Sequence, residues 1–269
     1  MHRVDFHSRY GAWLSPRVSA LLRPRRDWNA RLSAGAGVFA PTPLTEETEA
    51  TGLSRLLPIG SLGVERARGA AADVGGRIGP AEVNVSGYVT VVDHPVAFRP
   101  LPPPGADLEL VNAAEPTRAA GIETFARWRR EPLTLTAAYE YLRATELDVE
   151  RGFRRDVPLD PRHAAGLTAV WEEEDDTRLG IEAYYTGRQA IPDDPYRATG
   201  RPYVFVDALA QQRFGRLVVF LHGEDLNDVR QGRFDPLLLR SRDAAGRWTT
   251  GVWAPLQGRT LNLGVRWKY

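Results

Sequence analysis

Five histidines and scattered carboxylates are the residues of this chain that could bind a metal ion. Two histidines and an aspartate lie within residues 2–7, but nothing around them fixes their geometry, so we treat their spacing as chance. His163 and His222 lack partners at the spacing of a zinc site. Asp193 and Asp194 offer two carboxylates, whereas calcium takes about six to eight oxygen ligands. The sequence therefore predicts no metal site.

Glycine-rich segments next to serine or arginine could indicate nucleophilic catalysis or phosphate binding. The segment 60–63 lacks the spacing of a nucleophile elbow, and the segment 75–79 lacks the pattern of a phosphate-binding loop. The chain has no cysteine, which excludes a thiol nucleophile and a disulfide framework. We expect a protein that is not an enzyme and that has no cofactor.

Aromatic and basic residues in two predicted loops could bind a small anionic chelate by stacking and charge. Guanidinium groups and aromatic rings suit such a ligand. The alternative is ordinary packing within the loops. The candidates for external ligand contact are Tyr196, Arg197, Arg201, Trp248 and Trp253.

Polar residues that alternate with apolar ones along predicted strands form the second candidate set. They would face the interior of a barrel and contact a ligand or a plug, or they would simply form a hydrated wall with ion pairs between neighbouring strands. These residues are Arg17, Arg31, Glu123, Arg127, Glu140, Glu182, Tyr184 and His222.

The strands that would position these residues are clearest at the end of the sequence. Between Thr260 and Tyr269, apolar and polar residues alternate up to a terminal aromatic residue. Such alternation predicts a strand with one apolar and one polar face. A terminal aromatic residue suits the membrane interface of an outer-membrane barrel, and Leu263, Val265, Trp267 and Tyr269 fit the signal that a barrel-assembly machinery recognises.

The same alternation recurs along the whole chain and predicts an all-β, antiparallel, up-and-down transmembrane barrel. The connections alternate between short and long, as in outer-membrane barrels. About eleven strands are expected, an odd number that is half of a 22-stranded barrel. They cover residues 12–23, 28–38, 62–75, 83–91, 121–128, 133–141, 165–171, 179–186, 203–213, 217–226 and 260–269.

Aromatic residues cluster at both ends of the predicted apolar face. Trp28, Trp128, Trp171 and Trp267 lie near the short turns, and Tyr139, Tyr141 and Tyr185 lie toward the long loops. Two such girdles are typical of a sheet that crosses a bilayer.

Composition is consistent with this class of protein. The 35 basic and 34 acidic residues give a net charge of +1, which predicts no nucleic-acid partner. No apolar run is long enough for a transmembrane helix. The first seven residues lack the apolar segment of a signal peptide.

Three segments resemble TonB-dependent outer-membrane receptors. Residues 35–46 resemble a mid-barrel strand followed by an F-x-A-P loop, residues 217–231 resemble the v-x-N-L-x-D stretch, and residues 258–269 resemble the closing strand. In the second segment Glu224 and Asp225 replace the residues more usual in the family.

The resemblance implies a 22-stranded barrel around an N-terminal plug that imports scarce ligands such as ferric siderophores, haem, cobalamin or sugars. Residues 1–269 would be the C-terminal portion of the barrel, as an incomplete chain without plug, TonB box or signal peptide. The implied location is a Gram-negative outer membrane. The implied partners are its lipid, the barrel-assembly machinery, the TonB complex through an N-terminal half, and a small-molecule chelate.

Two alternatives stay open. Open sheet edges cannot persist in lipid, so a chain of this length could form a passive or oligomeric outer-membrane pore. A soluble carbohydrate-binding β-sandwich would instead bury the apolar face inside a core.

Overall fold

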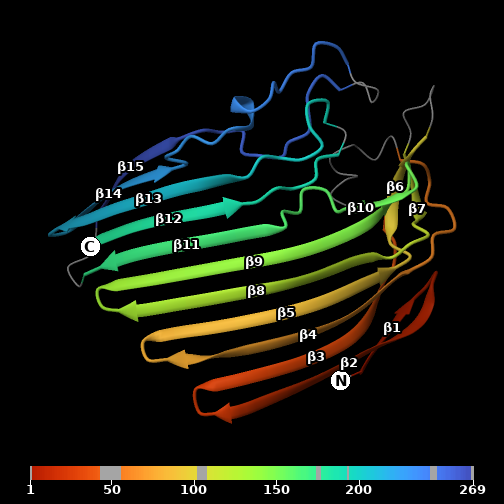
Figure 1. Ribbon diagram of the computed structural model, residues 1–269, viewed down its shortest axis with the longest axis horizontal. Helices are drawn as coiled ribbons and strands as arrows, with labels where there is room; N and C mark the ends of the chain where they lie inside the picture. The colour runs from red at the N-terminus through yellow and green to blue at the C-terminus, as the bar shows by residue number, and fades with distance from the viewer. Residues whose placement is uncertain are drawn as a thin grey trace.

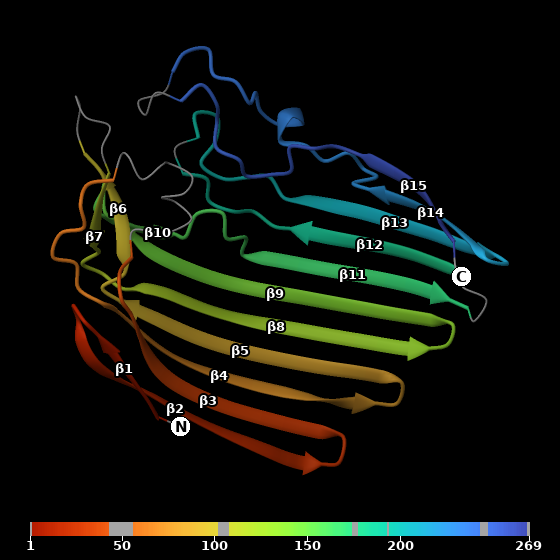
Figure 2. The same ribbon diagram turned by 180° about the vertical axis from the view of Figure 1, so that it is seen from behind.

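The computed structural model describes residues 2–42, 56–101, 108–173, 177–192, 194–242 and 247–267. One large antiparallel sheet dominates the protein and curves like a section of a cylinder wall (Figure 1). Short turns join its strands at one end, and long connections join them at the other, as Figure 2 shows from behind. The predicted all-β, up-and-down arrangement is confirmed.

Eleven long strands in the described residues correspond one for one to the predicted strands. They are β2 (Gly11–Arg25), β3 (Trp28–Phe39), β4 (Glu65–Ile78), β5 (Ala81–Asp93), β8 (Thr117–Arg130), β9 (Leu133–Asp148), β11 (His163–Glu172), β12 (Arg178–Thr186), β13 (Tyr203–Phe214), β14 (Leu217–Glu224) and β15 (Thr260–Trp267). Each pairs with the next long strand in the chain.

Four shorter strands were not predicted. β1 (His2–His7) pairs with β2, and β10 (Phe153–Asp156) pairs with the distal end of β9. β6 (Val96–Pro100) and β7 (Leu108–Asn112) form a separate hairpin. The segments 93–115 and 145–162, which lie between predicted strands and were expected to be long loops, are therefore partly β-structure, because hairpins occupy much of both.

The sheet does not close on itself within the described residues. β1 and β15 are its two edge strands, and neither pairs with the other (Figure 1). An edge strand leaves a row of backbone N–H and C=O groups unpaired, which an isolated sheet cannot sustain in lipid.

The strand register separates the sheet into an apolar face and a polar face. Val18 pairs with Ala34, Ala34 with Ala70 and Ala70 with Val89, so apolar side chains stay on one side from strand to strand. The same face holds Leu263, which is 76% exposed. Only two of the buried apolar residues found among the described ones, Leu110 and Val218, lie in strands. The apolar face is therefore not covered by a protein core.

Aromatic residues mark both ends of the apolar face, as predicted. Trp128 pairs with Leu135, close to the short turn after β8. At the other end, the Tyr139 hydroxyl lies 2.8 Å from Nδ1 of His163, whose ring is 5.3 Å from that of Tyr141.

Helical structure is confined, in the described part of the chain, to the short 3₁₀ segment η2 (Gln231–Arg233). None of the described helical residues forms a segment long and apolar enough to cross a membrane.

Candidate functional site

The register places the predicted interior residues together on the polar face of the sheet. Each lies opposite a residue of the same face on the neighbouring strand, and none falls on the apolar side. The eight residues are Arg17, Arg31, Glu123, Arg127, Glu140, Glu182, Tyr184 and His222.

Two pairs of carboxylates lie directly opposite each other near the middle of this face. Glu123 pairs with Glu140 across β8 and β9, and Glu182 pairs with Asp207 across β12 and β13. Like charges in this position repel each other and destabilise a sheet. The structure gives none of the four an ion pair among the described residues.

Hydroxyl groups donate hydrogen bonds to three of these carboxylates. Ser86 donates to Glu123 at 3.2 Å, and Tyr88 donates to Glu140 at 3.3 Å. Tyr184 donates to Glu182 at 2.7 Å. These contacts occupy acceptor positions of the carboxylates but bring no positive charge to either pair.

Basic residues of the polar face lie mainly toward the short turns. Arg77, Arg129 and Arg213 each lie two positions from a turn. Arg77 forms an ion pair of 2.7 Å with Glu82, which is opposite Arg127 on the next strand. The polar face thus has carboxylates without ion pairs among the described residues at mid-height, and most of its guanidinium groups toward the short-turn end.

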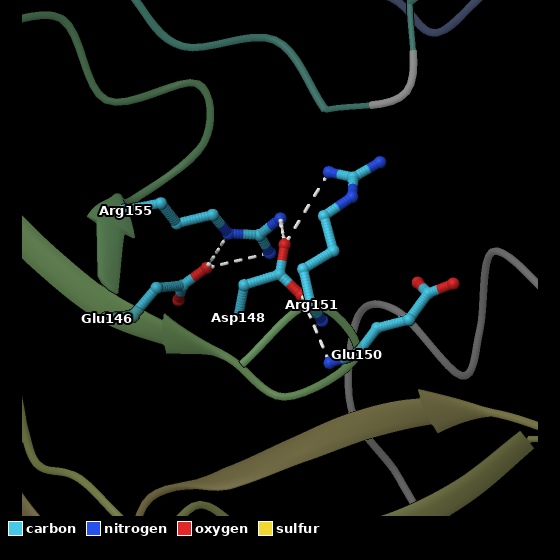
Figure 3. A network of polar contacts seen from close by, with 5 residues as sticks. All are labelled: Glu146, Asp148, Glu150, Arg151 and Arg155. Atoms are coloured by element: carbon cyan, nitrogen blue, oxygen red, sulfur yellow. Dashed lines mark hydrogen bonds and ion pairs between the residues drawn. The ribbon is translucent and has the colours of Figure 1, made fainter. Parts of the chain in front are cut away.

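An ion-pair network holds the end of β9 against β10 at the long-loop end (Figure 3). Arg155 lies between Glu146, at 2.9 Å, and Asp148, at 2.8 Å. Asp148 is buried and also accepts hydrogen bonds from the backbone N–H groups of Glu150 and Arg151. A cavity of about 600 Å³ adjoins this network, and Phe98 and Leu110 also line it. The β9–β10 hairpin is therefore an ordered element at the long-loop end of the sheet, rather than an irregular loop.

The two long connections that follow β12 and β14 pack together through a small core of their own. Ile191, Trp253 and Ala254 form this core, and the ring of Phe234 lies 5.6 Å from that of Trp253. Gln231, which is fully buried, accepts hydrogen bonds from the N–H groups of Trp253 and Ala254. We call the described residues of 187–202 and 225–259 the loop cluster.

Two of the predicted ligand-contact residues serve this packing. Trp253 is 4% exposed, and the guanidinium of Arg197 lies 5.5 Å from the centre of its ring. Arg197 also forms an ion pair with the buried Asp235, and this hydrogen bond raises the pKa of the arginine. These two side chains hold the cluster together and are little exposed to solvent.

The remaining three residues of that set lie on the surface of the cluster. Trp248 is 51% exposed, and the guanidinium of Arg242 lies 5.2 Å from its ring centre. Tyr196 is 44% exposed, and Arg201 lies over the ring of Phe234 at 5.7 Å. Ligand contact by any of the five residues stays a prediction.

Comparison with known proteins identifies the family. The family model described as "TonB dependent receptor-like, beta-barrel" matches residues 2–226. The chain belongs to this family. None of the curated protein sequences is significantly similar to the chain.

Several solved receptors and transporters share the fold. A mutant of the ferric enterobactin receptor PfeA from Pseudomonas aeruginosa is 15% identical, with 98% of this chain and 41% of that chain covered and a TM-score of 0.71. The FrpB iron transporter from Neisseria meningitidis is 16% identical, with 96% and 40% covered and a TM-score of 0.69. The ferric-catecholate import receptor Fiu from E. coli is 16% identical, with 95% and 35% covered and a TM-score of 0.66. The chain therefore spans about two fifths of the length of these proteins.

The stretch that resembles the v-x-N-L-x-D motif of these receptors forms a tight anchor for the loop cluster. The Asn227 side chain bonds to the N–H of Val206 and to the carbonyl of Val204, continuing the β13 ladder. Asp225 has a positive φ of 48°, is 1% exposed, and accepts a hydrogen bond from the N–H of Val229. The polar residues of this motif thus serve to bond backbone groups at the turn that follows β14.

Asp228 completes this anchor by linking it to the beginning of β15. Its carboxylate accepts a hydrogen bond from the N–H of Arg259 at 3.1 Å and bonds to Arg230 and Arg233. The Arg259 amide, followed by the charges of the two other arginines, lowers the pKa of Asp228. Sequence reasoning found the motif but missed this role, because it depends on a contact with a residue 31 positions away.

The predicted assembly-signal residues that are described lie on the exposed apolar face. Leu263 is opposite Leu221, Val265 is opposite Val219, and Trp267 is opposite Leu217. Tyr269 lies outside the described residues. The described part of the chain holds no group of three or more potential metal ligands. Nδ1 of His222 lies 3.3 Å from a carboxylate oxygen of Glu224, its one ion-pair partner among the described residues.

Proposed function

We propose that this chain is the C-terminal portion of the barrel of an outer-membrane TonB-dependent receptor that imports a scarce ligand, such as a ferric siderophore or cobalamin. The observation that carries the proposal is the contrast between the two faces of one open sheet. The apolar face is exposed and bordered by aromatic residues, which suits contact with lipid. The polar face then lines the lumen, and the sheet edges pair with the rest of a larger barrel.

The carboxylates of the polar face support a contact with basic groups inside that barrel. Glu123 and Glu140 face each other without an ion-pair partner among the described residues, so a cation placed between them would remove their repulsion. We propose that a plug or a ligand supplies this cation. The protein would act by binding and conformational change, without catalysis and without a cofactor of its own.

The test is the location and mass of the native protein, detected with an antibody against residues 227–259 in an isolated outer-membrane fraction. We expect a species of roughly twice the 29.9 kDa of this chain or more, consistent with the two-fifths coverage of the solved receptors. Absence from the outer membrane would contradict the proposal. A species of 29.9 kDa in that fraction would instead favour an oligomeric pore.

The lumen contact is tested separately by permeability. Replacing Glu123 and Glu140 together with glutamine should loosen an interior plug and increase sensitivity to vancomycin, which is too large for an intact outer membrane. Glu150→Gln, on an exposed turn, removes one carboxylate charge outside the sheet and serves as the control. Equal sensitivity of both variants would refute the contact.

A further inference from the structure

Four arginines interrupt the apolar face near the long-loop end. Arg66 and Arg68 lie on β4, Arg118 on β8 and Arg143 on β9, and all four are exposed. Their faces follow from the register, because each pairs across strands with residues of the apolar side, such as Val91 or Ala120.

These arginines are close enough to act on one ligand group. Arg118 is a diagonal neighbour of Arg143, at roughly 7 Å, because Ala120 pairs with Arg143. Arg68 and Arg118 both pair with Val91, which places them about 10 Å apart, two strand spacings. We call Arg68, Arg118 and Arg143 the arginine cluster.

Most of this positive charge is not neutralised within the described residues. Arg68 lies 3.5 Å from Asp93, whereas Arg118 and Arg143 form no hydrogen bond or ion pair with any described side chain. Arginine on a lipid-facing surface is costly at mid-membrane and much less so at the interface. The energetic cost of the cluster on this face therefore depends on its height along the strands.

The cluster lies at the distal boundary of the apolar band. Arg143 is about 11 residues beyond the short turn at Glu131–Pro132, and a rise of about 3.3 Å per residue at a tilt of about 45° gives a height of roughly 25 Å. This is about the height of the apolar band of an outer-membrane barrel. Head groups of the outer leaflet would lie at this level.

A groove of about 890 Å³ runs across the sheet and reaches Arg143 of this cluster. One wall is the cross-strand row from Val18 on β2 to Arg143 on β9, and the other is the row from Ala20 to Tyr141. Both rows point to the apolar side, so the groove lies on that face, and the row between them contributes mainly backbone to its floor. Alanine and glycine side chains in both walls leave the space open.

We propose that this groove and the arginine cluster bind a phosphorylated lipid of the outer leaflet, with an acyl chain along the groove and a phosphate against Arg118 and Arg143. Guanidinium groups bind phosphate through paired, charge-assisted hydrogen bonds. A free phosphate would leave the apolar groove without a ligand, and an uncharged lipid would bring no anionic group to Arg118 and Arg143. The inference rests on the proposed function, because it requires this face to be in an outer membrane.

The test uses the full protein purified from outer membranes in a non-ionic detergent, with bound lipid counted by native mass spectrometry. The probes are lipid A with both phosphates and the same lipid without phosphates. At roughly fivefold in affinity for each arginine near an anionic head group, the variant Arg118→Gln/Arg143→Gln should bind lipid A about 25-fold more weakly. Loss of the phosphates should have a comparable effect.

Two variants make the result specific. Arg129→Gln/Arg213→Gln removes two charges from the polar face near the short turns and should bind lipid A normally. Gly87→Leu should weaken binding by filling the groove, and the sheet has room for it, because an added Cβ would meet its nearest atom only at 3.8 Å. Heat-modifiable migration in electrophoresis confirms that each variant is folded.

The outcomes separate this inference from the proposed function. Equal binding of the two lipids, unchanged binding by Arg118→Gln/Arg143→Gln, or an equal loss in the polar-face variant would overturn the lipid site alone. Absence of the wild-type protein from the outer membrane would overturn the proposed function, and the lipid site with it.

Discussion

Gln231 is the side chain on which the loop cluster depends most, and Gln231→Ala should open the cluster locally. Its Nε2 donates to the carbonyl of Gly251 at 2.7 Å, and its Oε1 accepts from the N–H groups of Trp253 at 2.9 Å and Ala254 at 3.3 Å. Trp253 and Ala254 are 4% and 6% exposed, so water does not readily replace the lost acceptor.

The magnitude follows from these three contacts. An unsatisfied buried N–H costs about 1–3 kcal/mol, and the substitution leaves two of them. The longer bond to Ala254 contributes less, and the exposed Gly251 carbonyl can bond to water, so we expect a total of about 3 kcal/mol. Since 1.4 kcal/mol is about tenfold in an equilibrium, protection against hydrogen exchange should fall roughly a hundredfold in the cluster.

Hydrogen-exchange mass spectrometry of peptides from residues 187–202 and 248–256 measures this effect directly. Gln257→Ala changes the same residue type at an exposed position of the same connection and should leave protection unchanged. Amides of β11 and β12 should keep their protection in both variants. Equal effects of the two substitutions, or loss of protection across the whole sheet, would refute the idea of a local cluster held by Gln231.

Two further predictions concern the sheet and the loop anchor. Gly76→Val should lower the free energy of unfolding in urea by about 1–3 kcal/mol, because an added Cβ would overlap the Trp28 indole. Gly37→Val, with no atom within 4 Å, should be tolerated, and equal stabilities of the two variants would refute this. Because the pKa of Asp228 is lowered in the folded protein, its carboxylate stabilises the fold fully above the usual carboxyl pKa. This stabilisation is lost as pH falls through the lowered pKa. Hydrogen-exchange protection of the Arg259 amide should therefore persist below pH ~4 and then fall. Asp228→Asn should abolish this pH dependence, and an unchanged profile in that variant would contradict the assignment.

Alternation predicted the long strands because each strand has lipid-compatible residues on one side only. Where the apolar face of a strand is only weakly apolar, its ends were predicted less accurately. The strand predicted at residues 62–75 begins and ends three residues later in the structure, as β4 (Glu65–Ile78). Its alanines and glycines differ little in polarity between the faces, so pairing with β3 and β5 determines its ends.

Strands beyond the apolar band carry no such signal. β10 pairs with the end of β9 through Arg155, Glu146 and Asp148, residues whose polarity gives no alternation. Ion pairs and hydrogen bonds stabilise this hairpin, and sequence alone does not show which charged residues will meet. The same limit applies to Arg197 and Trp253. Their residue types suggested ligand contact, which stays a prediction, but did not show that both side chains are mostly buried.

The candidate interior residues illustrate the division between what alternation can and cannot predict. Alternation assigns Glu123 and Glu140 to the same face, but only the register makes them direct neighbours. That register follows from the tight turn between β8 and β9, where Arg130 pairs with Leu133. A shift of one residue would move every side chain of a strand to the other face, so the apolar face itself enforces the register. The two carboxylates therefore face each other because the apolar side chains of β8 and β9 must stay on one face. A cation on the polar face is the simplest way to offset their repulsion.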